Sequence, residues 1–325
     1  MKYSTNIIKM VVAVVVAGVA GICVPLLISS ASLLSLMTQA VIYAIGTLGV
    51  GFLLRQNGHV SFGHAAYYGL CGYGIVLCSK LFGLSTGTAI IVVIGLAGLA
   101  AFGVGLVIVR TPGIAFAMIT LAIGQVFYIL MAKARGFTGG VDGLVVELPA
   151  TIFGLPAELF GRPGSMFVIC WLTLVVVMFL LVLLIKSRFG ALTEAIRENE
   201  ERARFIGFTT VVPRALIYTI SGMICALAGI LSSLYSAFVS PDSLHWGLSG
   251  SFLVSALLGG TSLLSGTVIG AVFYFLLKDV LSNVTTHWMS IIGVCLIAVI
   301  VFWPEGIAGG MSRGAKKFRA LAGRS

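Results

Sequence analysis

The sequence is dominated by long apolar runs, each about as long as a lipid bilayer is thick. A transmembrane α-helix needs about 20 consecutive apolar residues. This length delimits ten candidate segments: 7–28, 32–54, 62–79, 88–109, 113–132, 166–185, 215–236, 249–264, 266–283 and 288–303. Only 9% of the residues are charged, whereas soluble domains carry about 25%. The sequence therefore predicts an all-α integral membrane protein, a polytopic bundle of about ten transmembrane helices.

The third and eighth segments are interrupted by glycine, serine and histidine, which predicts short or broken helices there. The stretches 57–74 and 246–266 share this composition and occupy similar places in the two halves of the chain. In transporters such interrupted helices surround a central pathway, but glycines such as Gly266 and Gly270 also permit close helix packing. Both interpretations remain open from the sequence. His64, in the first stretch, is either a structural histidine or a group that contacts a solute.

The distribution of positive charge gives the predicted orientation. Lysine and arginine near span ends accumulate on the cytoplasmic side of a membrane. With ten spans both termini lie on one side, and fifteen of the 20 lysines and arginines fall on that side. The other five are Lys80, Lys133, Arg135, Arg162 and Lys278. We therefore predict cytoplasmic termini, a transmembrane domain over 1–310 with an internal loop at 186–214 and an external loop at 133–165, and a basic cytoplasmic tail at 311–325.

The internal loop contains the longest polar helical pattern in the chain. Between residues 192 and 206, apolar or small residues recur at three- and four-residue steps, opposite a face that carries Glu194, Arg197 and Glu198. Glu198 and Arg202 lie one turn apart on such a helix and can support each other weakly. The pattern fits either a solvated linker helix or a helix that docks on a cytoplasmic subunit.

Motifs for nucleotide hydrolysis, metal binding and covalent catalysis are absent from the sequence. It has no GxxxxGK[ST] phosphate loop, no HExxH metal helix and no GxSxG nucleophile elbow. We therefore expect no enzyme activity, and no cofactor or metal bound by this chain. Lys278 and Asp279 are a charged pair within the ninth segment, but the spans lack the acidic residues of many proton-coupled carriers. The net charge of +10 is explained by topology, and no basic domain for nucleic acid is present.

Six short motifs stand out along the chain. They are Gly58-x-x-Ser-Phe-Gly-His-Ala-Ala, Thr138-Gly-Gly-x-Asp-Gly-Leu, Phe189-Gly-Ala-x-x-x-Ala-Ile-Arg-Glu-Asn-Glu, Ile220-Ser-Gly, Leu258-Gly-Gly-x-x-x-x-x-Gly and Phe302-Trp-Pro-Glu-Gly-Ile. Together they resemble the branched-chain amino acid ABC transporter permeases of the LivM type, over nearly the whole chain. The resemblance implies a permease in a bacterial inner membrane. It also implies a second, related permease, two cytoplasmic ATPase subunits that bind ATP and Mg, and an external substrate-binding protein.

The resemblance also implies roles for individual residues. In such permeases the ATPase receives the internal loop, which here maps to Glu194, Ala195, Ile196, Arg197, Glu198 and Asn199. Residues that face the pathway or the binding protein map to Ser61, His64, Thr138, Gly139, Gly140 and Asp142. The expected substrate is leucine, isoleucine or valine, and the alternatives in related permeases are urea, short amides or aromatic acids. An ion-driven secondary carrier is the competing function.

Overall fold

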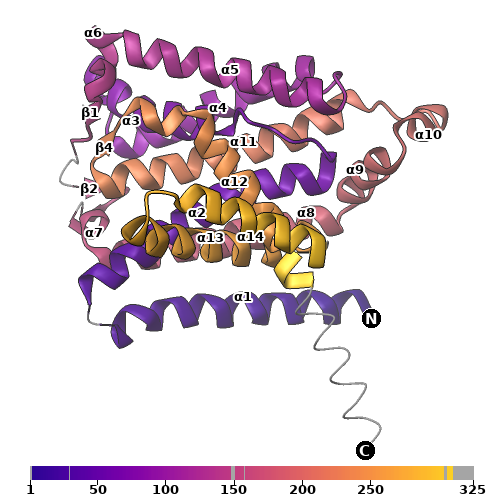
Figure 1. Cartoon of the computed structure of the whole chain (residues 1–325), viewed down its shortest axis with the longest axis horizontal. Coiled ribbons are helices and arrows are strands. Elements are labelled where there is room, and N and C mark those ends of the chain that lie inside the picture. The colour runs from indigo at the N-terminus through magenta and orange to yellow at the C-terminus, as the bar shows by residue number, and fades with distance from the viewer. Residues whose placement is uncertain (1, 29, 148–150, 157, 304–305, 310–325) are drawn as a thin grey trace, which may run out of the picture.

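Helices make up almost all of the computed structural model, which describes residues 2–28, 30–147, 151–156, 158–303 and 306–309 (Figure 1). Ten of them form the bundle: α1 (Lys2–Leu27), α2 (Ala31–Asn57), α3 (His64–Phe82), α4 (Thr86–Ile108), α5 (Gly113–Lys133), α8 (Pro163–Lys186), α11 (Val211–Ser236), α12 (Trp246–Gly259), α13 (Leu264–Val284) and α14 (Trp288–Phe302). Each coincides with one predicted segment, and the ends differ by at most five residues. The predicted all-α polytopic fold is confirmed.

Two interruptions distinguish this bundle from a simple set of crossing helices. Within the described residues, eight helices are long and apolar enough to cross a membrane, and α12 is a shorter apolar helix. The 14 residues of α12 rise only about 21 Å at about 1.5 Å per residue, less than the roughly 30 Å hydrocarbon core. The second interruption lies between Asn57, where α2 ends, and His64, where α3 begins. Both fall in the stretches predicted to be broken.

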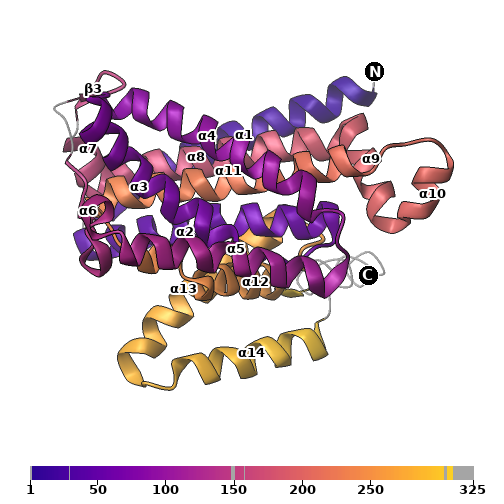
Figure 2. The same ribbon diagram turned by 90° about the horizontal axis from the view of Figure 1, so that it is seen from above.

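The helices alternate in direction, so the connecting segments gather at two ends of the bundle (Figures 1 and 2). The α10 end carries α9 (Arg188–Glu198), α10 (Glu200–Phe205) and both ends of the described chain. The opposite end, which we call the clasp end, carries α6 (Arg135–Thr138), η1 (Gly140–Asp142), β1 (Leu144–Val145), β2 (Thr151–Ile152), β3 (Leu155–Pro156), α7 (Glu158–Gly161) and β4 (Phe238–Val239). That the α10 end is cytoplasmic stays a prediction, and the basic tail at 311–325 lies outside the described residues.

The centre of the bundle is built by α2 and α11, which pack against each other. In the apolar part of α2 67% of the residues are buried, and in α11 72%, against 17% in α5 and 12% in the helix that begins at Trp288. Small residues allow the close approach, because a Cβ added at Gly49 would lie 2.8 Å from the main-chain oxygen of Ser221. Figure 2 shows α14 standing apart from the bundle. The single chain therefore leaves α5 and α14 largely exposed.

A substitution at Gly229 tests the packing of α11 against α3. A Cβ at this position would overlap the main-chain carbonyl of Tyr68, which cannot turn aside as a flexible side chain can. We expect Gly229→Ala to lower the free energy of unfolding by about 1–3 kcal/mol, the usual cost of overpacking. The purified variant should therefore melt at a lower temperature.

The matched control is Gly95→Ala on α4, where nothing lies within 4 Å of an added Cβ. This control should change the free energy of unfolding by less than about 1 kcal/mol. Equal melting temperatures for the two variants would contradict the close contact between α3 and α11.

Candidate functional site

Two helices begin inside the bundle, and their first turns meet. After β4 the chain forms the short helix η2 (Pro241–Leu244), whose Leu244 is 1% exposed and packs against Gly69 of α3. The first turn of α12 follows, and the Ser249 hydroxyl accepts a hydrogen bond from the main-chain N–H of Ala65 at 2.7 Å. Segments that are far apart in the sequence thus place the N-termini of α3 and α12 side by side.

A buried junction of Ser61, His64 and Ser221 lies at this meeting point, and all three side chains are 0% exposed. His64 Nδ1 lies 2.8 Å from Ser61 Oγ, and Nε2 lies 2.7 Å from Ser221 Oγ. Because the Ser221 hydroxyl donates to the main-chain oxygen of Gly49, it accepts from Nε2–H, and Nδ1 accepts from Ser61. Both ring nitrogens are satisfied, which favours the structural interpretation of His64. Contact of Ser61 or His64 with a solute stays a prediction.

A wide groove of about 750 Å³ runs beside α12, between α12, α13 and α14. We call it the α12 groove. Asp242, His245 and Lys278 line it, and the Lys278 ammonium lies 5.4 Å from the ring centre of Trp288. The rest of the wall is mostly apolar and includes the first turn of α12. One space therefore offers an anion, a cation, the N–H groups of a helix N-terminus and apolar surface.

A second, more polar space adjoins the groove. Two neighbouring cavities of about 350 and 280 Å³ lie between α2, α3 and α11, and we call them together the serine vestibule. Asp242 and Leu248 line both the vestibule and the α12 groove, so the two spaces meet at the start of α12. The hydroxyl groups of the vestibule come from Tyr43, Tyr68, Ser232, Ser233, Tyr235, Ser236, Ser240 and Ser243.

The remaining residues that were predicted to face the pathway or the binding protein lie at the clasp end, away from the buried junction. Thr138 is 1% exposed, and its hydroxyl donates to the main-chain oxygen of Met131 at 2.6 Å. Gly139 and Gly140 have φ of +72° and +65°, which glycine adopts without strain. This tight turn leads into β1, which pairs with β4 and so ties the end of α5 to the segment before α12. Asp142 is exposed and accessible to a partner.

The predicted coupling residues divide between the two sides of α9. Ile196 is 1% exposed, and Thr193 donates a hydrogen bond to Gln56 of α2 at 2.8 Å. The Arg197 guanidinium donates to the main-chain oxygen of Arg55. These contacts hold α9 against the end of α2. The other predicted residues are partly or fully exposed: Glu194, Ala195, Glu198 and Asn199.

Asn199 ends α9 and caps α10, which corrects the prediction of one continuous polar helix. Its side-chain oxygen accepts a hydrogen bond from the main-chain N–H of Arg202 at 2.8 Å, the role of an N-cap. Glu198 and Arg202 therefore do not share one helix. The ion pairs that stabilise α10 are instead those of Glu200. Its carboxylate oxygens lie 2.5 Å from the guanidinium groups of Arg204 and Arg214. Because Arg214 belongs to α11, Glu200 fastens α10 to the core of the bundle.

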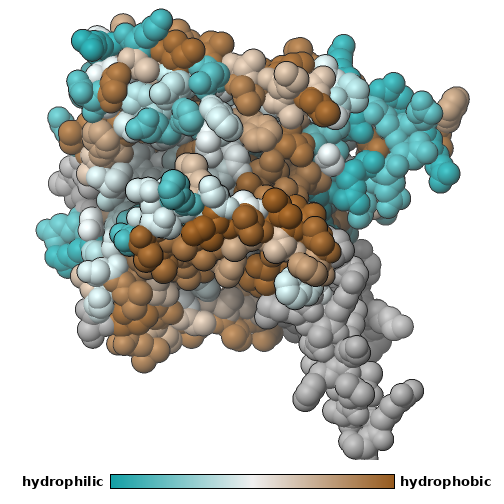
Figure 3. Space-filling model, viewed as in Figure 1, coloured by the Kyte–Doolittle hydropathy of each residue, from teal (hydrophilic) through white to brown (hydrophobic). Residues whose placement is uncertain are grey.

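Beyond this ion cluster, three apolar side chains stand exposed at the end of α10. Phe205 is 90% exposed, Ile206 68% and Phe208 50%. Figure 3 shows that the lobe around them is hydrophilic. Exposed aromatic residues on a polar surface are typical of interaction sites. Ile206 belongs to the apolar pattern predicted from the sequence, whereas Phe205 and Phe208 do not. The start of a second helix could have been predicted, because Asn199 followed by two glutamates is a usual start signal of a helix.

The titration of Glu200 reports on this joint between α10 and α11. Burial alone would raise the pKa of Glu200, but the hydrogen bond from Thr210 and the positive charges of Arg214 and Arg204 outweigh burial and hold the pKa below its usual value. The ionised Glu200 carboxylate therefore stabilises the folded state, and this stabilisation is complete at pH values above the ordinary pKa of a glutamate. That stabilisation is lost as the pH falls through the lowered value.

We expect Glu200→Gln to loosen α10, because the charge-assisted hydrogen bonds are removed. At a cost of about 1.5 kcal/mol, amide hydrogen exchange over 200–207 should become roughly tenfold faster at neutral pH. Glu201→Gln is the matched control, since Glu201 is exposed, and its exchange should stay at the wild-type rate. In the unmodified protein the same loosening should appear only in acid. Equal exchange rates in the two variants would contradict the joint.

Comparison with known proteins places this architecture in a family. The model of the family described as "branched-chain amino acid transport system / permease component" matches residues 32–301. The high-affinity branched-chain amino acid transport system permease protein LivM of Salmonella typhimurium is 23% identical in an alignment of 304 residues that covers 87% of this chain and 71% of LivM. No solved structure gives a significant match.

A second group of relatives carries a different name. The autoinducer 2 import system permease protein LsrC of Escherichia coli O9:H4 is 31% identical in an alignment of 269 residues that covers 77% of this chain and 72% of LsrC. LsrC of Salmonella paratyphi B is 32% identical in an alignment of 287 residues that covers 84% of this chain and 76% of LsrC. The family match extends from α2 into α14 and so includes the buried junction, the α12 groove and α10. The chain therefore belongs to the family of branched-chain amino acid transport system permease components.

Proposed function

We propose that this chain is one of two permease subunits of an ATP-driven importer in a bacterial inner membrane. It forms half of the path for an aliphatic, branched-chain amino acid that an external binding protein delivers. The α12 groove carries this proposal, because it places groups for both charges of an amino acid beside an apolar wall. The relatives named LivM support the same substrate class. ATP and Mg are bound by separate ATPase subunits, and the permease itself catalyses no reaction.

Each part of an amino acid meets matching chemistry in the α12 groove. The Lys278 ammonium and the N–H groups at the start of α12 attract the carboxylate. Asp242 attracts the ammonium group, and because it also lines the serine vestibule, it can receive the solute from there. Leu253 and Val254 line the groove along α12 and take an aliphatic side chain, since burial of apolar surface is favourable.

The serine vestibule favours a second candidate, a hydroxylated, sugar-like solute. Its wall presents many hydroxyl groups, which can exchange hydrogen bonds with the hydroxyl groups of such a solute. The relatives named LsrC, which are named for autoinducer 2 import, support this candidate. Urea, short amides and aromatic acids are the alternatives that the resemblance implied, and no particular feature of the described residues favours them.

The second permease subunit covers α5 and α14 in this proposal. These helices are among the least buried of the bundle, and Figure 3 shows apolar surface over α14. The α12 groove lies beside α14, so a partner seated there closes the groove into a path. The binding protein meets the clasp end, where Asp142 is exposed.

The ATPase subunits act on α9 and α10. Phe205 and Ile206 offer apolar contacts to an ATPase surface. The ion pairs of Glu200 with Arg204 and Arg214 hold α10 on α11, so α10 stays attached to the bundle when the ATPases move it. Movement then reaches α11 through Arg214 and α2 through Thr193. Because α2 and α11 form the centre of the bundle, a shift of α10 favours one of two packings, which is how alternating access is driven.

Uptake by the complete importer in proteoliposomes tests this function. The permease pair, the ATPases and the binding protein are reconstituted together, and radiolabelled leucine is supplied outside. We expect uptake that requires both ATP and the binding protein. Uptake by the permease alone, driven by an ion gradient, would replace the proposal with a secondary carrier. Uptake of a sugar-like solute in place of leucine would favour the second candidate.

Lys278→Met tests the solute site within that importer. A charge-assisted hydrogen bond contributes about 1.5–3 kcal/mol, so we expect leucine uptake to fall by roughly tenfold or more at unchanged amounts of assembled complex. Lys80→Met is the matched control, an exposed lysine at the end of α3, and should keep wild-type uptake. Full uptake by Lys278→Met would remove Lys278 from the path.

Phe205→Ser tests the ATPase contact. Because about 1.5–3 kcal/mol is lost when a buried aromatic contact is removed, we expect roughly tenfold weaker binding of the ATPases to the purified permease pair. Phe137→Ser is the matched control, since Phe137 is 63% exposed at the clasp end, and it should bind the ATPases normally. An equal effect of the two substitutions would show that the contact lies elsewhere.

A further inference from the structure

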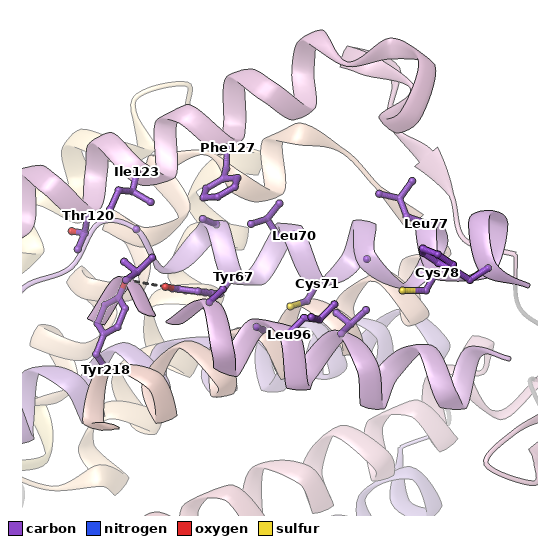
Figure 4. Close-up of a pocket in the computed structure, with 18 residues that line it drawn as sticks. Tyr67, Leu70, Cys71, Leu77, Cys78, Leu96, Thr120, Ile123, Phe127 and Tyr218 are labelled. Carbon is purple, nitrogen blue, oxygen red and sulfur yellow. Dashed lines mark hydrogen bonds between the residues drawn. The ribbon is translucent and has the colours of Figure 1, made fainter. Parts of the chain in front are cut away.

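A long apolar slot follows α3 on the side where α4 and α5 pass (Figure 4). We call it the α3 slot. Its lining extends along α3 from Gly63 to Phe82, almost the whole helix, and its volume is about 270 Å³. An apolar cavity of about 150 Å³ is already large enough to hold a benzene molecule. The slot therefore has room for a longer hydrocarbon, and its shape fits an extended one.

The wall of the α3 slot offers almost no polar group to a ligand. Among the residues that the structure describes, none that lines the slot is charged. The hydroxyl of Thr120 donates to the main-chain oxygen of Ala117 at 2.9 Å, and that of Tyr67 donates to Tyr218 at 3.2 Å. Water needs two or more polar partners to stay in a cavity, and an amino acid needs partners for both charges. The slot suits neither.

Small residues keep the slot open, and its rim faces the surroundings of the bundle. Gly74 on α3 and Ala97 and Ala100 on α4 leave space where larger side chains would close it. On the rim, Phe82 is 73% exposed and Leu96 58%. The apolar part of α4 is only 22% buried. In a chain that spans a membrane, a surface of this kind meets lipid.

We propose that the α3 slot binds one hydrocarbon chain of a membrane lipid, laid along α3 with its methyl end toward Tyr67 and Tyr218. An empty slot of this size would cost the packing contacts that its lining atoms lack, and an acyl chain supplies them. The Tyr218 ring contacts His64 with ring centres 5.4 Å apart. The bound chain therefore ends one side chain away from the buried junction. This site is separate from the proposed amino acid path.

Photo-crosslinking of the full-length permease in lipid nanodiscs tests the site. Two phospholipids are compared, one with a diazirine near the methyl end of its acyl chain and one with the diazirine near the ester. We expect the first to label peptides that contain Tyr67 or Thr120, and the second to label those that contain Cys78 or Phe82. Labelling that is spread evenly over α4, α5 and α14, whatever the diazirine position, would overturn the proposal.

A filled slot provides the second arm of the test. Ala100→Trp places an indole in the slot from an exposed position, and labelling of the Tyr67 peptide should fall by roughly fivefold or more because the space is taken. Leu99→Trp is the matched control, since Leu99 is 72% exposed on the same helix and does not line the slot. It should label like the wild type. Equal labelling in the two variants, or displacement of the label by excess leucine, would overturn lipid as the occupant.

Discussion

The structure depends on one constraint: inside a membrane, a main-chain N–H or C=O that leaves a helix must find its hydrogen-bond partner within the protein. Two segments of this chain break off inside the bundle, before α3 and before α12. Their ends are satisfied by side chains, since Ser249 accepts from Ala65, and Thr120 accepts from the N–H of Phe62 at 3.2 Å. His64 joins the same network through Ser221. The short helix α12, and with it the α12 groove, exists because these partners are present.

The segments that cross the membrane could be predicted closely from the sequence, because hydropathy along the chain is a one-dimensional signal. The glycine and serine content of 57–74 and 246–266 also predicted interrupted helices. The sequence could not predict that Ala65 and Ser249 meet, because no periodicity links residues so far apart. His64 was identified as a candidate because it lies in the first of these interrupted stretches. Whether it faces a path or a structural hydrogen-bond partner depends on Ser221, which only the fold brings near.

The site residues show the same division. Lys278 was visible as a charge within a span, but its position over Trp288, in a groove that Asp242 also lines, follows from the return of the chain through η2 and α13. Thr138 was predicted to face the pathway or the binding protein. Its side chain is buried and its hydroxyl donates to the main-chain oxygen of Met131, and a contact with the pathway or a partner stays a prediction. At the α10 end the predicted coupling residues are partly used to hold α9 on α2. The exposed apolar contacts lie further along, at Phe205 and Ile206, because Asn199 starts a second helix.

Three features of the chain fit the proposal that it is one half of a larger assembly: two largely exposed helices, an open groove and a polar lobe with exposed apolar side chains at its end. The direction of transport in this account depends on α10 lying in the cytoplasm, where ATP is available. Labelling of Phe205→Cys and Val141→Cys with a membrane-impermeant maleimide, in sealed vesicles of both orientations, measures this most directly. The account predicts that position 205 reacts only in inside-out vesicles and position 141 only in right-side-out ones. The reverse pattern would contradict it.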